Sequence, residues 1–108
     1  MAAKVLIPSG ALWITYSKEA LKEGLKNKPD IIVIDGGSTD SGPAYLGQGV
    51  SKYSRATTKS EWKVLMETIA SLNIPLVIGS AGTCGTNTSV DWFLKITQEI
   101  AKELANKN

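Results

Sequence analysis

Histidine is absent from this chain, and cysteine occurs once, at Cys84. Without histidine, the chain alone cannot build a Ser-His-Asp or Cys-His catalytic group. A zinc site is also disfavoured, because imidazole and thiolate are the ligands that zinc usually takes. A single cysteine excludes an intrachain disulfide and a cysteine-based metal site. We therefore expect a cytoplasmic protein.

Aromatic side chains, net charge and long apolar runs are scarce as well. Aromatic residues make up 6% of the chain, and its formal net charge is only +2. Both values oppose a nucleic-acid partner. No apolar run is long enough to span a membrane, and the short run after Lys4 ends at Pro8, which does not fit a signal peptide. We expect no nucleic-acid and no membrane partner.

The remaining composition is that of a globular protein. The chain has 108 residues, of which 43% are apolar and 20% charged. This length suits a single domain over residues 1–108 that can bury a core without disulfides or metals.

Three short apolar runs alternate with three helical patterns. The strands are predicted at Lys4–Ile7, Asp30–Asp35 and Pro75–Ser80. One helix is predicted from a cap at Ser17 to about Lys28. A second is predicted after a capping box at Thr58–Glu61, and a third after a cap at Thr88 or Ser89, with Phe93 on its core stripe. This alternation predicts an α/β fold: a three-layer βαβαβα unit with a short parallel sheet, Rossmann-like or flavodoxin-like, in strand order 2-1-3.

A sheet of three strands would leave both edges open. Open edges are usually paired or covered, so we expect this unit to dock onto more sheet, from a second copy or from a larger partner chain. One connection is unusually long, because Gly36–Thr57 shows no strong pattern. A loop of that length is typical of a lid or a binding loop.

Polar, glycine-containing segments follow all three predicted strands. They are Ser9–Gly10, Asp35–Ser41 and Ser80–Asn87. Parallel strands present their carboxyl ends at one edge of the sheet, where ligands bind. Glycine lets backbone amides approach a ligand, and the third segment leads into a helix whose N-terminus favours an anion. Turn formation and helix capping explain the same residues equally well.

Asp35 is the leading candidate for a chemical role. At the end of a buried strand it could act as a base, bind a ligand hydroxyl, or hold a metal together with Asp40. The alternative is structural: the carboxylate accepts local backbone amides in an Asx turn. Because two carboxylates make a thin ligand set for Mg²⁺, we predict no metal site.

Two further residues have both a chemical and a structural interpretation. Cys84 precedes a helix N-terminus, a position that can lower a thiol pKa and produce a nucleophile. Without a histidine partner, a small buried filler is the alternative. Arg55 is the only arginine of the chain. It could bind a carboxylate through a bidentate pair of hydrogen bonds, or it could lie on the surface.

Several motifs together resemble the N-terminal region of the acyclic terpene utilisation family. Those motifs are Lys4–Gly10, Asp35–Pro43, Tyr45–Gly47, Lys52–Arg55, Ile78–Gly85 and Val90–Trp92. The resemblance covers nearly the whole chain, which would correspond to about the N-terminal quarter of a member. It implies a small subunit or domain of a catabolic enzyme that acts on a small carboxylate or an acyl-CoA.

The resemblance also implies a site lining. Its residues are Asp35, Gly36, Gly37, Ser38, Thr39, Asp40, Tyr53, Arg55, Ser80, Gly82, Thr83, Cys84 and Asp91, and the first strand end adds Ser9 and Gly10. Asp35 and Cys84 are the catalytic candidates, and the others would bind substrate. Lyase, hydratase or isomerase chemistry is expected rather than redox chemistry, because no nicotinamide fingerprint is present. A non-catalytic ligand-binding or scaffolding module is the alternative, and the sequence leaves the identity of any cofactor open.

Overall fold

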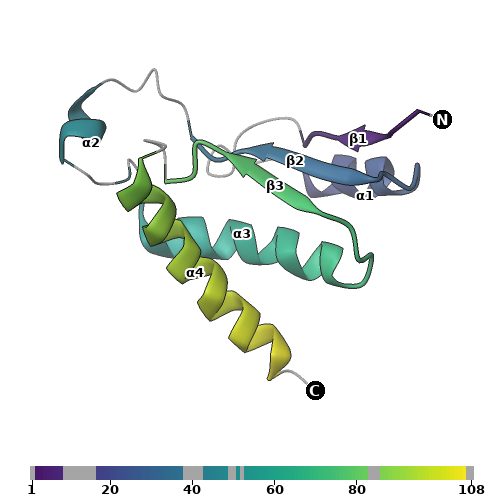
Figure 1. Cartoon of the computed structure of the whole chain (residues 1–108). Helices are drawn as coiled ribbons and strands as arrows, with labels where there is room; N and C mark the ends of the chain where they lie inside the picture. The colour runs from purple at the N-terminus through teal and green to yellow at the C-terminus, as the bar shows by residue number, and fades with distance from the viewer. Residues whose placement is uncertain are drawn as a thin grey trace.

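A computed structural model describes residues 2–8, 17–37, 43–48, 51, 53–82 and 86–106 of the chain (Figure 1). Its elements follow one another as β1 (Val5–Leu6), α1 (Lys18–Leu25), β2 (Ile31–Asp35), α2 (Pro43–Gln48), α3 (Arg55–Ala70), β3 (Leu76–Gly79) and α4 (Asn87–Ala105). The predicted mixed α/β class, with a short parallel sheet, is confirmed.

The three strands lie in the order β1-β2-β3, so the predicted order 2-1-3 is wrong. Val5 pairs with Ile31, and Val33 pairs with Val77, all in parallel register. β2, with five residues, pairs with both neighbours, whereas the two residues of β1 pair with β2 alone. The longest apolar run among the three strands thus takes the central position, where both of its edges are hydrogen-bonded.

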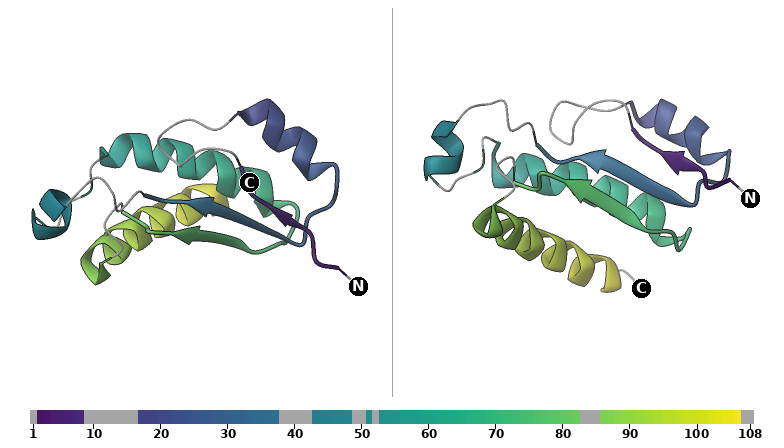
Figure 2. Two further views of the ribbon diagram at one scale, coloured as in Figure 1. Left: turned by 90° about the horizontal axis from the view of Figure 1, so that it is seen from above. Right: turned by 45° about the horizontal axis from the view of Figure 1, so that its top comes forward.

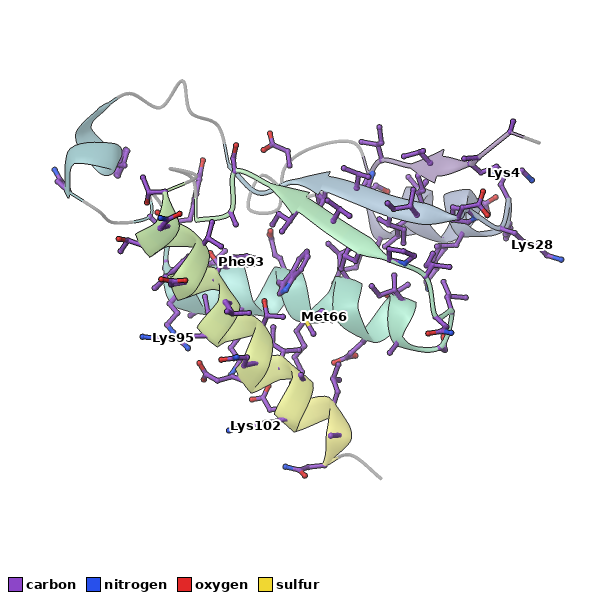
Figure 3. All side chains as sticks on the ribbon, viewed as in Figure 1. Lys4, Lys28, Met66, Phe93, Lys95 and Lys102 are labelled. Atoms are coloured by element: carbon purple, nitrogen blue, oxygen red, sulfur yellow. The ribbon has the colours of Figure 1, made fainter. Side chains whose placement is uncertain are left out.

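The core lies between one face of this sheet and three helices. Ile32 and Ile34 of β2 are almost completely buried on that face. Leu21 of α1 and the stripes of α3 and α4 pack in the same cluster as Ile34. Trp62 and Phe93 join the two long helices, with their ring centroids 4.9 Å apart in an edge-to-face arrangement. Figure 3 shows Phe93 on α4 and Met66 on α3 where these helices meet.

The opposite face of the sheet is covered by no described helix. Its residues are apolar: Val5 and Val77 are 54% and 45% exposed, and Ile31 and Val33 between them are half-buried. The predicted three layers are therefore two in the described part of the chain. Strand order explains this, because two right-handed crossovers that advance in the same direction across a sheet place both helices on one face (Figure 2).

Helix starts were predicted with mixed success. Ser17 caps α1 as predicted, accepting a hydrogen bond from the Ala20 amide at 3.1 Å. The capping box at Thr58–Glu61 is wrong: α3 begins at Arg55, and the buried Thr58 hydroxyl donates to the Ser54 carbonyl at 2.9 Å. The cap of α4 is Thr86 rather than Thr88 or Ser89.

The long connection after β2 is also shorter than predicted. It contains α2, and α3 begins within its last residues, so Gly36–Thr57 is not one irregular loop. Among the described residues, no helix is both long and apolar enough to cross a membrane.

We predict that Ile96→Ala destabilises the protein strongly. Ile96 of α4 is fully buried in the core cluster, so the substitution removes packing and leaves a cavity. The expected loss in the free energy of unfolding is about 2–5 kcal/mol, measured by urea denaturation. Leu72→Ala is the control, because Leu72 is 44% exposed. Equal losses for the two variants would contradict the described core.

Candidate functional site

The carboxyl ends of β2 and β3 lie side by side, as the sequence predicts for parallel strands. Asp35 pairs in register with Gly79. The next amide, that of Gly36, donates to the Gly79 carbonyl at 2.6 Å. A Cβ at Gly36 would lie 2.8 Å from that carbonyl oxygen and 2.5 Å from the Ile78 side chain, so this close approach requires glycine. The two strand ends thus form one surface.

Asp35 is exposed at this edge. Its Oδ1 atom accepts a hydrogen bond from the Gly37 amide at 2.9 Å. This contact is the Asx turn that the sequence offered as the structural interpretation, and it fixes the direction of the carboxylate. An exposed, oriented carboxylate can still accept a proton or a ligand hydroxyl, so the two roles are compatible.

The loop after β3 begins in an unusual backbone conformation. Ser80 has a φ of +53°, which non-glycine residues adopt infrequently, and Gly82 has a φ of +76°. Gly82 is buried against Ser89 of α4, and Thr86 accepts a hydrogen bond from the Ser89 amide at 3.2 Å. The described start of this loop, residues 80–82, therefore packs against the start of α4, beside the edge that carries Asp35.

Arg55 belongs to an ion-pair network between α3 and α4. Its guanidinium contacts the Glu99 carboxylate, while Lys59 and Lys63 both contact Glu103. Hydrogen bonds from Lys59 and Lys63 lower the pKa of Glu103 below its ordinary value. An arginine engaged in this way favours the surface interpretation over a carboxylate clamp.

The other predicted site residues are spread out or lie outside the described part of the chain. Tyr53 is half-buried against the core cluster, and Asp91 is exposed on the second turn of α4. Outside the described residues lie Ser9, Gly10, Ser38, Thr39, Asp40, Thr83 and Cys84. Within the described ranges, no group of three or more acidic or cysteine side chains could hold a metal ion.

Sequence reasoning missed an apolar groove beside β3. Its volume is about 350 Å³, and it is lined by Trp62, Ile78, Ala81, Val90, Phe93 and Leu94, with Ser80 and Thr97 as polar members. Val90 and Leu94 remain 45% and 50% exposed on α4. The sequence held one signal: these two apolar residues are four apart and lie off the buried Phe93, Ile96 and Ile100 stripe.

No family model, curated protein or solved structure matches the chain. The resemblance to the acyclic terpene utilisation family accordingly stays a prediction.

We predict that Gly82→Ala destabilises the protein, whereas Gly79→Ala does not. An alanine Cβ at position 82 would lie 2.7 Å from the Ser89 Cβ, at a positive φ. The expected loss in the free energy of unfolding is roughly 1–3 kcal/mol. At Gly79 the added Cβ meets nothing within 4 Å. Thermal melts of both variants test this, and a Gly82→Ala variant as stable as the parent would show that the loop packs differently.

Proposed function

We propose that this chain is a subunit or domain of a cytoplasmic catabolic enzyme, related to the acyclic terpene utilisation family, that acts on a small carboxylate or an acyl-CoA. One observation carries the proposal: Asp35 stands oriented at the end of the central strand, in register with Gly79. Ligands of parallel α/β proteins bind at this edge of the sheet. Two of the motifs that resemble the family, Asp35–Pro43 and Ile78–Gly85, begin at these strand ends.

In this proposal Asp35 is the base or the ligand of a substrate hydroxyl. Because Arg55 contacts Glu99, backbone amides of the glycine-containing loops would hold the substrate anion. Moving a proton to or from the carbon next to a carbonyl is a step that many lyases, hydratases and isomerases of carboxylates and acyl-CoA thioesters have in common. A positioned carboxylate can perform that step without a redox cofactor.

The test is Asp35→Asn, which keeps the shape of the side chain and the Gly37 hydrogen bond but removes the basic oxygen. We expect kcat of the assembled enzyme on an acyclic isoprenoid acyl-CoA to fall by about 10²–10⁴-fold. Asp30→Asn is the matched control, because Asp30 is exposed and lies at the opposite end of β2. Unchanged turnover in the Asp35 variant, with assembly intact, would overturn the catalytic role.

A second candidate is a non-catalytic module that completes the sheet of a larger partner and contributes one wall of a shared site. The sheet has three described strands, so both of its edges can accept a further strand. The apolar face with Val5, Ile31, Val33 and Val77, which no described helix covers, gives the same partner a surface to pack on. Large apolar patches on soluble proteins commonly mark interaction surfaces. The native mass of the particle that contains the chain distinguishes a stable assembly from a lone monomer.

A further inference from the structure

The two edges of the sheet differ in how well they resist pairing. At one edge, β1 has only two residues, with Lys4 before it and Pro8 shortly after it. Short length, lysine and proline are devices by which natural edge strands avoid a further strand. At the other edge, β3 has four residues, Leu76–Gly79, and none of them is charged. Pro75 precedes β3, but its carbonyl accepts a hydrogen bond from the Ile32 amide and so faces β2 rather than the edge. Among the described residues, the β3 edge is therefore less protected than the β1 edge.

Backbone hydrogen bonds show which groups of β3 face the open edge. Ile32 donates to the Pro75 carbonyl at 3.0 Å, and Gly36 donates to the Gly79 carbonyl at 2.6 Å. Backbone groups alternate in direction along a strand, so residues 75, 77 and 79 turn theirs toward β2. Leu76 and Ile78 consequently direct their N–H and C=O groups away from the sheet. These groups match the backbone of an extended chain.

The apolar groove lies next to this edge. Seen nearly face-on in the right panel of Figure 2, α4 runs beyond β3 on the side away from β2. In parallel α/β sheets, a helix packs against the strands on the face that it covers. At this place Val90 and Leu94 are half exposed beside Ile78, and the groove contains no charged residue. A strand placed at the edge could insert one apolar side chain there.

We propose that the β3 edge binds one extended segment of a partner protein, which adds as a fourth strand beside β3. Leu76 and Ile78 would form the backbone hydrogen bonds, and an apolar side chain of the segment would contact Leu94 in the groove. In this mode of recognition, main-chain hydrogen bonds provide the affinity, and the groove that receives the side chain provides the selectivity. This proposal rests on the second candidate function, the module that completes a partner's sheet. It adds that the β3 edge is the contact and that a single strand of the partner occupies it.

A second copy of the chain fits this edge less well. If two β3 strands paired about a twofold axis perpendicular to the sheet, the long helices of both copies would lie under the same seam, on the face where α4 already lies (Figure 2). Head-to-tail pairing would instead need the protected β1 edge. A single strand from another protein avoids both conflicts.

The experiment isolates the tagged full-length chain with its bound partner from its own cells and measures amide hydrogen exchange in the complex and in the free chain. We expect exchange at Leu76 and Ile78 to slow at least tenfold in the complex, while Val77 and Gly79, whose amides face β2, change little. Side-chain docking alone would not produce this alternation. A chain that binds no partner, or protection that omits Leu76 and Ile78, would overturn the proposal.

A pair of matched variants tests the groove. Leu94→Lys should weaken partner binding at least tenfold, because it places a charge in an apolar groove. Leu72→Lys, the same change at a similarly exposed leucine of the turn after α3, should leave binding intact. Equal binding by both variants, or a homodimer as the only complex, would contradict the inference. Turnover of the Asp35→Asn complex is a separate readout, so the catalytic proposal can stand or fail independently.

Discussion

The hydrogen-bonded pairing of β2 with both neighbouring strands is the constraint on which the other features depend. Through it, Ile34 is held in the centre of the cluster that α1, α3 and α4 cover. The same pairing brings the Gly36 amide to the Gly79 carbonyl and so joins the two loops at the carboxyl edge. The first four residues of β2 are apolar, with Ile32 and Ile34 buried in the core, and its only polar residue, Asp35, lies at the carboxyl edge of the sheet.

Strand order then determines what is covered and what is exposed. With β2 in the middle and both crossovers on one side, one sheet face is enclosed by helices and the other keeps Val5, Ile31, Val33 and Val77 uncovered among the described residues. Arg55, Lys59 and Lys63 of α3 form ion pairs with α4 on the solvent-exposed side of the contact between these two helices. Exposed pairs of this kind contribute little stability each, so the apolar interior of the layer dominates its packing.

Local signals in the sequence were reliable where a single contact decides the outcome. Ser17 was predicted to cap α1 and does so, and Phe93 was predicted to face the core and is 4% exposed. The Thr58–Glu61 pattern failed because Ser54, four residues earlier, offers an equally good cap and allows a longer helix. Strand order failed because it depends on which strands pair across the sheet, a long-range outcome that apolar runs in the sequence do not reveal. The site was predictable to the same degree: the sequence placed Asp35 and Ser80 at one edge, but it could not foresee that Arg55 would contact Glu99 or that Val90 and Leu94 would border a groove.

The candidate site and the open edge are adjacent, and this proximity links the two proposals. Ile78 turns its backbone toward the β3 edge, while Ser80, two residues later, begins the loop beside Asp35. A parallel strand added at β3 would end next to that loop and bring its own following residues to the same surface. Described residues at this surface supply one oriented carboxylate and several backbone groups, which is less than most ligand sites contain. Docking at the edge would therefore supply missing walls of the site, and catalysis would depend on assembly because the substrate would be enclosed only when both chains are present.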